Sequence, residues 1–388
     1  MPIYPYTKSG KEHWYYAFEV KDRNGKRKTI KERGFTGKTA AREAERLARV
    51  EWDKGTYLDP SKLTVEDYLP QWLKDKQDIS PETRETYESH LKVHINPAVG
   101  KVLVQKFGVK DIKSLIKFLQ EYKQENGKNL SEGTIKKIYN IVQTAFGAAK
   151  IEGLINIDPF DSMDKGSVPK VNKVNHDYWT KDEVKQFFSK LDHRFKILFV
   201  IAVYTGMRRG EITGLRWSDV DLDNGILSIR QTLKPRGRIK DGGKSVNASR
   251  SITLSPFVIS ELKKHRAMIV QERWGAVERY RNLSELEHAQ KNYKDLDLVI
   301  CQTNGDPISI GNFTKFWNGV IKKTEMRYIK FHDLRHTCAS LLLSNGTHPK
   351  VVQELLGHSS ISITLDTYSH MLPNMQEEAV KSLDKLLN

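Results

Sequence analysis

Three short stretches in the last part of the chain concentrate side chains that suit chemistry on a phosphodiester. They are Thr205–Glu211, His332–His336 and Leu356–His358, and Tyr368 follows the last of them. Arginine binds phosphate through a planar fork of donors that stays charged, and histidine exchanges protons near neutral pH. A tyrosine hydroxyl can act as a covalent nucleophile. Together these groups supply what phosphoryl transfer needs: a nucleophile, stabilisation of the oxygens that gain charge and a proton for the leaving oxygen.

Each stretch alone also has a simpler structural interpretation. Arg208 could lie on a solvated helix face, and Tyr368 could pack within a helix as one of 15 tyrosines. His332 and His336 stand at the i, i+4 spacing that can hold a metal ion, but Asp333 occupies the position where a zinc protease needs glutamate. We therefore predict no metal site, and we expect His336 to have a structural or supporting role.

Taken in this order, the stretches resemble the active site of the tyrosine recombinases, the phage-integrase family. The strings that carry the resemblance are TGMRRGE, HDLRHT, LLGHSS and TLDTYSH, all between about residue 176 and the C-terminus. The order arginine, lysine, His-x-x-Arg, histidine, tyrosine is specific to this family. The resemblance implies a site-specific DNA recombinase that integrates, and also excises, the DNA of a phage or mobile element.

The resemblance assigns a role to each matching residue. Tyr368 matches the nucleophile, which attacks the scissile phosphate and leaves a 3′-phosphotyrosyl link that allows rejoining without ATP. Arg208 and Arg335 match the two arginines that clamp the phosphate. His332 and His358 match the positions that orient the phosphate and manage protons. Strand exchange through a Holliday junction, with no metal or nucleotide cofactor, is also implied.

The family's general-acid lysine, which protonates the leaving 5′-oxygen, is matched best by Lys244. A Gly-Gly-Lys-Ser string precedes a strand predicted over Ser249–Leu254, although serine stands where the family tends to have threonine. Lys234 and Lys240 are close enough in sequence to be alternatives. Glu211 matches an acidic position after the first arginine, and we interpret it as fixing the local helix, not as a base.

The charge of the chain agrees with a nucleic-acid partner. Its 388 residues include 64 lysines and arginines and 48 aspartates and glutamates, a formal net charge of +16 at pH 7. Basic proteins bind polyanions, of which nucleic acid is the commonest in a cytosol. The first 50 residues carry 13 basic and 6 acidic side chains, which indicates a basic module at the N-terminus.

Composition excludes several other classes of protein. No apolar run reaches the ~18 residues that a transmembrane helix needs, so no membrane partner is expected. The N-terminus lacks the apolar segment of a signal peptide, so we expect a cytoplasmic protein. Cys301 and Cys338 are too far apart for a CxxC motif, which excludes structural zinc bound through cysteine.

The pattern of predicted elements indicates three domains of different class. The first is a small α+β unit with a β-sheet and one helix, the second is all-α, and the third is mostly α-helical with a small β-sheet. We place them at residues 1–56, 64–160 and 175–388. By pattern and order, the first two resemble the arm-binding and core-binding domains of the larger integrases.

Within the first domain, strands are predicted over His13–Val20 and Arg27–Arg33, and a helix over Thr39–Trp52. The strands are suited to entering a major groove as a β-ribbon. The basic residues that we expect to contact DNA are Lys26, Arg27, Lys28, Lys31 and Arg33. The residues that we expect near one face of the helix are Ala40, Ala44 and Leu47, with Val50 or Glu51 as the next position.

Signals for helices and strands occur throughout the other two domains. Ser80 before Pro81 predicts a helix start, and Thr180–Glu183 predicts a capping box. In the third domain, strands are predicted over Gly225–Arg230 and Ser249–Leu254. Residues 266–297 are expected to be helical in part, and we assign them no role.

The resemblance implies double-stranded DNA as the partner, with core-type and arm-type attachment sites. It also implies a homotetramer on DNA, to which a last helix over Asn374–Leu387 contributes by passing to a neighbouring subunit. A directionality factor or a host DNA-bending protein could take part as well. Two other functions stay open: a type IB topoisomerase that shares the tyrosine chemistry, and a DNA-binding regulator without enzymatic activity.

Overall fold

The computed structural model describes most of the chain. Described are residues 3–21, 25–172, 177–234, 238–241, 250–278, 296–309 and 311–368, with Asp384 and Leu387. They divide into two compact units, Met1–Lys173 and Val174–Asn388. Lys244 and most of the predicted last helix lie outside the described residues. None of the described helices is long and apolar enough to cross a membrane.

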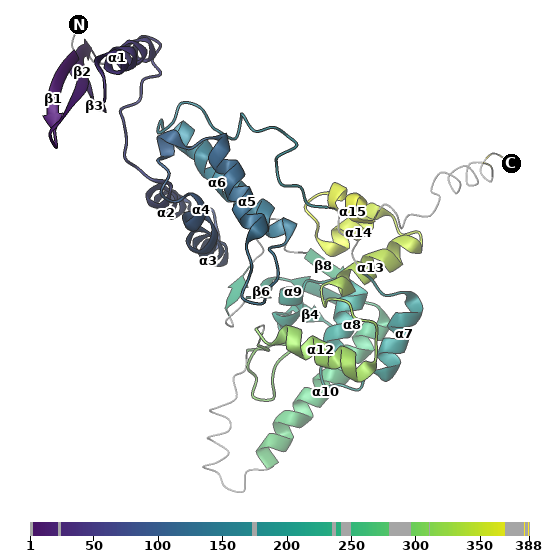
Figure 1. The fold of residues 1–388 in the computed structure, drawn as a ribbon. Coiled ribbons are helices and arrows are strands. Elements are labelled where there is room, and N and C mark those ends of the chain that lie inside the picture. Colours follow the sequence, from purple (N-terminus) through teal and green to yellow (C-terminus); the bar gives the residue numbers. More distant parts are fainter. Residues whose placement is uncertain are drawn as a thin grey trace. The chain divides into compact units, whose positions relative to one another are not determined.

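The first unit begins with a three-stranded antiparallel sheet in the order β1-β2-β3 (Figure 1). Its strands are β1 (Ile3–Lys8), β2 (Lys11–Lys21) and β3 (Arg27–Phe35). The two predicted strands are confirmed, and β1 is an additional edge strand. Its residues are mostly exposed, so it lacks the alternation of apolar side chains that predicts a strand.

One helix, α1 (Lys38–Asp53), packs on this sheet, but with a different face from the one predicted. It buries Ala41, Glu45 and Ala48, whereas Leu47 is 49% exposed. The sheet already supplies large apolar side chains to this small core. The helix therefore contacts the sheet mainly through alanines, together with the side chains of Glu45 and Trp52, and the centre of the expected face was wrong by one position.

The rest of the first unit is helical, as predicted. Its longer helices are α2 (Val65–Asp75), α3 (Pro81–His90), α5 (Val109–Glu121) and α6 (Glu132–Ile151), with the short α4 (Asn96–Val99) between them. A π-helical turn, Leu91–Ile95, continues α3. The predicted capping role of Ser80 is confirmed, because its side chain accepts a hydrogen bond from the Thr83 amide. These helices enclose a core of their own.

The second unit combines helices with two small sheets. Its helices are α7 (Lys181–Lys190), α8 (Lys196–Thr205), α9 (Arg209–Thr213), α10 (Pro256–Glu278), α12 (Phe313–Thr324), α13 (Asp333–Ser344), α14 (Pro349–Leu356) and α15 (Ile361–Tyr368). One sheet has the order β4-β5-β8, with β4 (Val220–Asp221), β5 (Ile226–Ile229) and β8 (Arg250–Thr253). The other pairs β6 (Gln231–Leu233) with β7 (Ile239–Asp241). Both predicted strands of this region are confirmed, as is the capping box at Thr180.

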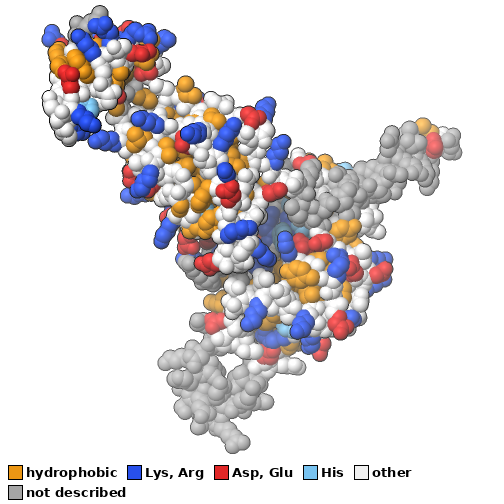
Figure 2. Space-filling view, in the orientation of Figure 1, with side chains coloured by type: hydrophobic (Ala, Val, Ile, Leu, Met, Phe, Trp, Pro, Cys, Tyr) orange, Lys and Arg blue, Asp and Glu red, His pale blue; other side chains and the backbone are white. Residues whose placement is uncertain are grey.

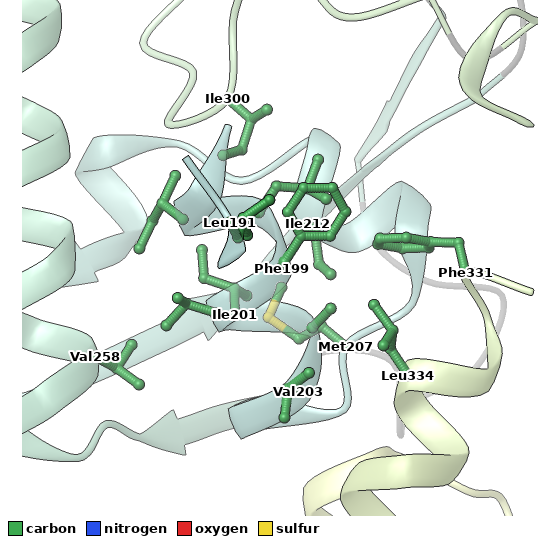
Figure 3. Packing of buried hydrophobic residues seen from close by; sticks show 14 of the residues in the cluster. Leu191, Phe199, Ile201, Val203, Met207, Ile212, Val258, Ile300, Phe331 and Leu334 are labelled. Carbon is green, nitrogen blue, oxygen red and sulfur yellow. The ribbon is translucent and has the colours of Figure 1, made fainter. Parts of the chain in front are cut away.

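The apolar helix α8 forms the centre of the second unit. Nearly all of its side chains are buried, and α10 and α13 pack against it. Figure 3 shows Phe199, Ile201 and Val203 from α8 within the same cluster as Phe331 and Leu334, which flank the start of α13. This core fixes the end of α8 beside the start of α13, where the first two motif stretches lie.

Candidate active site

Four segments of the second unit carry the predicted catalytic side chains. The loop from α8 to α9 carries Arg208, and α13 begins just after His332 and includes Arg335. The turn after α14 carries His358, and Tyr368 is the last residue of α15. Helices α13, α14 and α15 contact one another. Residues far apart in sequence are therefore brought to one place by the packing of α8 against α13.

Gly206 is the close-contact point between these segments. It ends α8 with a φ of +61°, and a Cβ there would lie 2.4 Å from Cδ2 of Leu356 and 3.4 Å from Sγ of Cys338. Only glycine adopts such a left-handed conformation at no steric cost. Its carbonyl oxygen accepts a hydrogen bond of 2.8 Å from Nη1 of Arg335. The first motif is thereby joined to the second.

Arg335 is a buried cation. Only 4% of the residue is exposed, and burial together with the positive charge of Arg208 lowers the pKa of Arg335 to about 9. Within the described part of the chain it makes no ion pair with a carboxylate. A buried charge is costly unless an opposite charge compensates it. The carboxylate of Glu211 opposes part of this lowering without forming an ion pair with Arg335, so a bound anion would further stabilise the charge of Arg335.

Arg208 lies just before α9, and its guanidinium group is partly exposed to solvent. Its Nη1 donates to Oε1 of Glu211 at 2.9 Å, and its Nη2 donates to the carbonyl oxygen of Gly357 at 3.2 Å. The side chain is still 42% exposed. The charge of Arg208 contributes to the lowered pKa of Arg335, so the two guanidinium groups share one region of positive potential, which favours an anion.

Glu211 connects two arginines. Its carboxylate also accepts from Nη2 of Arg250 at 3.0 Å. Burial alone would raise the pKa of Glu211, but the charges of Arg250 and Arg208 and their hydrogen bonds lower it below its ordinary value. Glu211 also accepts a hydrogen bond from the Arg208 amide at 2.9 Å, so it holds the start of α9 as the sequence suggested.

Arg250 is a site residue that the sequence analysis missed. We predicted the strand that contains it but gave its side chain no role. A signal was available, because alternation along β8 places Arg250 on the same face as the buried Ile252. A buried arginine in a strand needs an anionic or carbonyl partner, and Glu211 was a candidate.

His358 is neutral at physiological pH in this structure. Burial, followed by the positive charges of Arg335 and Arg208, lowers its pKa to about 4. Its Nδ1 lies 2.8 Å from Oγ1 of the buried Thr364. His358 is therefore fixed in orientation, with a ring that carries no charge beside the two arginines.

Tyr368 is buried beside His336. The residue is 3% exposed, and its hydroxyl oxygen lies 2.5 Å from Nδ1 of His336. Burial raises the pKa of Tyr368, although the charge of Arg335 acts in the opposite direction. His332 lies edge-to-face with His336, with ring centroids 5.4 Å apart. The hydroxyl therefore lies within the electrostatic influence of Arg335, and His336 contacts it directly.

Comparison with known proteins decides the classification. The sequence profile described as "Phage integrase family" matches residues 177–375, which is more than half of the chain. The chain belongs to the phage integrase family. Its members are tyrosine recombinases, enzymes that cleave and rejoin DNA. The profiles for an arm DNA-binding domain and for a phage integrase N-terminal SAM-like domain match residues 2–51 and 64–120.

Two relatives align with this integrase-family chain over most of its length. It is 29% identical to a XerC-like tyrosine recombinase of Caldanaerobacter subterraneus subsp. tengcongensis, over 98% of both chains. It is 26% identical to the ICEBs1 integrase of Bacillus subtilis, over 80% of this chain and 79% of that protein.

Solved structures show the same fold at lower identity. The Tn1549 transposon integrase in complex with transposon right end DNA matches with a TM-score of 0.67 and 20% identity, over 84% of this chain and all of that one. A lambda integrase tetramer bound to a Holliday junction matches with a TM-score of 0.55 and 18% identity, over 94% of each chain.

The lysine of this integrase-family site stays a prediction. Lys244 lies outside the described residues. Of the alternatives, Lys240 belongs to β7 and pairs across the hairpin with Thr232, and Lys234 follows β6. The hairpin of β6 and β7 lies beside the segment that carries Arg208, because β6 packs on α9, which begins at the next residue.

The basic residues predicted on the N-terminal sheet lie on both of its faces. Lys31 and Arg33 lie over the ring of Tyr15, at 4.5 and 5.3 Å from its centroid, on the face opposite α1. Lys28 stands on the α1 side of β3 and forms an ion pair of 2.5 Å with Asp59. The predicted set is therefore divided, with Lys31 and Arg33 together on the exposed face.

Surface charge alone does not locate the site. Lysine and arginine side chains are spread over the visible face of each unit, with acidic side chains between them (Figure 2). Across the described residues, no group of three or more histidine, cysteine, aspartate or glutamate side chains could hold a metal ion. The feature that distinguishes the site is the group of Arg208, Arg250 and Arg335, of which Arg335 and the side chain of Arg250 are largely buried, in the same unit as the buried Tyr368.

Proposed function

We propose that the chain is the integrase of a phage or integrative mobile element and that its site acts directly on a DNA phosphodiester. The observation that carries the proposal is the buried Arg335, which lies close to Arg208 and Tyr368 and has no ion pair with a carboxylate in the described part of the chain. A scissile phosphate supplies the missing negative charge. Binding of the substrate therefore completes the electrostatics of the site.

In the proposed reaction, the hydroxyl oxygen of Tyr368 attacks phosphorus and the bond to the 5′-oxygen breaks. The hydroxyl proton passes to Nδ1 of His336, which lies 2.5 Å from that oxygen. Arg208 and Arg335 bind the phosphate oxygens that gain charge, and His332 and His358 orient the phosphate. Lys244 gives a proton to the leaving 5′-oxygen. The 3′-phosphotyrosyl bond keeps the energy of the broken bond, and attack by a 5′-hydroxyl of the partner duplex releases the tyrosine.

We further propose that residues 1–56 bind arm-type sites, 64–160 bind core-type sites and 175–388 catalyse. A chain that binds two DNA sites at once raises its effective concentration at the correct target. Strand exchange would take place in a homotetramer through a Holliday junction, as the assembly of the lambda integrase suggests. A directionality factor or DNA-bending protein fits this scheme, and the reaction would occur in the bacterial cytosol.

The test uses a nicked duplex that carries the attachment site of the element encoding this chain. Wild type is expected to form a protein–DNA adduct that survives denaturant, and Tyr368→Phe is expected to form none. Tyr328→Phe is the matched control, because Tyr328 is 52% exposed and is not part of the site. Tight binding without an adduct would instead indicate a regulator. In a parallel assay on a supercoiled plasmid that carries the site, relaxation without strand exchange would indicate a topoisomerase.

A further inference from the structure

Arg250 is the first residue of β8, and its guanidinium group is withdrawn from solvent. The side chain is 9% exposed, and Ile252 on the same face of the strand is fully buried. A guanidinium group in such a place must be compensated by an anion and by hydrogen-bond acceptors. The hydrogen-bond partners of this guanidinium group indicate its role.

The guanidinium of Arg250 joins two of the motif stretches. Its Nε donates to the carbonyl oxygen of Leu355 at 2.8 Å, and Nη2 and Nη1 donate to the two carboxylate oxygens of Glu211 at 3.0 and 3.4 Å. A Cβ on Gly357 would lie 2.8 Å from its Nη1. The turn between α14 and α15 therefore packs directly on the guanidinium group.

Two of the residues that contact Arg250, Glu211 and Gly357, also bind Arg208. Glu211 accepts from Nη1 of Arg208, and the carbonyl oxygen of Gly357 accepts from its Nη2. Arg250 thus supports both of the groups that fix the fork of Arg208. The turn that it supports also leads into His358. A shift of this support would move two side chains of the phosphate site at once.

We propose that Arg250 is a positioning residue of the recombination site. It sets Arg208 and the turn that carries His358, and it acts through Glu211, Leu355 and Gly357. The inference rests on the proposed function, because it assumes that Arg208 binds the scissile phosphate. Loss of Arg250 leaves Glu211 with one arginine instead of two and draws the fork of Arg208 out of place.

The experiment measures single-turnover adduct formation by full-length Arg250→Met on the nicked attachment-site duplex. A misplaced catalytic group can cost on the order of 100-fold in rate, and we expect a loss of about that size with DNA affinity within about threefold of wild type. The matched control is Arg194→Met in the same unit. Arg194 also binds a carboxylate, Glu272, and a backbone carbonyl, that of Cys301, so its loss imposes a similar structural defect away from the site.

A double-mutant cycle separates positioning from a structural role. If Arg250 acts largely through Arg208, then adding Arg250→Met to Arg208→Ala slows cleavage far less than Arg250→Met slows the wild type, and the loss that remains measures the part that acts through the turn of His358. Effects that multiply would overturn the inference, because Arg250 would then act independently of Arg208. A defect in Arg194→Met as large as that in Arg250→Met would overturn it as well.

A second variant guards against misfolding. Arg250→Lys keeps the charge opposite Glu211 but not the fork that spans Glu211 and Leu355, and we expect a folded protein with about tenfold slower cleavage. Wild-type rates in both folded Arg250 variants would overturn the inference and leave the proposed function standing. Absence of an adduct with wild type would overturn both.

Discussion

The hydroxyl oxygen of Tyr368 and Nδ1 of His336 lie 2.5 Å apart, and both residues are buried. Burial raises the pKa of Tyr368, so the hydroxyl is protonated at neutral pH and suits an imidazole nitrogen that accepts. His336 thereby holds the attacking oxygen in place before DNA binds. This contact gives a specific role to the histidine that the sequence marked only as supporting.

Replacing His336 should slow cleavage without weakening DNA binding. His336→Ala removes the partner of the Tyr368 hydroxyl, and we expect adduct formation to fall by about 100-fold, the lower end of what a positioned proton acceptor contributes. His336→Asn is the matched variant, because its side-chain oxygen can occupy nearly the position of Nδ1. Equal rates for the alanine variant and wild type would show that the contact has no part in the reaction.

The stability of the protein should depend on the protonation of His358. Its folded pKa is about 4 and its ordinary value is 6.5, so between these values the unfolded chain binds a proton that the folded chain does not. The contribution of a neutral His358 is therefore complete above pH 6.5 and is lost as the pH falls toward 4. Thermal unfolding should show a steeper loss of Tm over this window in wild type than in His358→Asn. Parallel curves would contradict the assignment.

Gly206→Ala should destabilise the site more than an ordinary substitution of a left-handed glycine. Gly346 is the matched control, since its φ is +80° and a Cβ there meets nothing within 4 Å. Gly346→Ala should cost about 1 kcal/mol of unfolding free energy from backbone strain alone. Gly206→Ala adds overlap with Leu356 and displaces the carbonyl that binds Arg335, so it should cost at least twice as much in denaturant unfolding and should also slow cleavage.

Local motifs and long-range contacts differ in how far the sequence reveals them. Arg208, Arg335, His358 and Tyr368 could be selected because each stands in a short string with a specific residue order. Their predicted roles agree with the way the structure groups them, but only the adduct experiment tests those roles. Lys244 could be selected too, yet it lies outside the described residues.

What the sequence could not show is how side chains from different strings meet. The contacts of Arg250 with Glu211 and Leu355 join residues 39 and 105 positions away, and such pairings are set by tertiary packing. The face of α1 was misjudged for a related reason. Helical spacing permits several faces, and the large side chains of the sheet select the one with small residues.

The N-terminal sheet should bind DNA through the face opposite α1. Lys31 and Arg33 lie together on that face over Tyr15, whereas Lys28 is already paired with Asp59 on the other side. Each phosphate contact that is removed should lower the slope of log affinity against log salt by about 1. Full-length Lys31→Ala and Arg33→Ala, titrated with a labelled duplex between low and moderate salt, should each show this change.

Lys28→Ala is the comparison that identifies the binding face. Its effect on the salt slope should be clearly smaller, because removing Lys28 deletes an ion pair within the protein and not a contact with phosphate. A slope that falls equally in all three variants would mean that charge on the sheet acts without regard to its face. A lower salt slope in Lys28→Ala alone would place the DNA on the α1 side of the sheet. It would contradict a role in DNA binding for the face that carries Tyr15, Lys31 and Arg33.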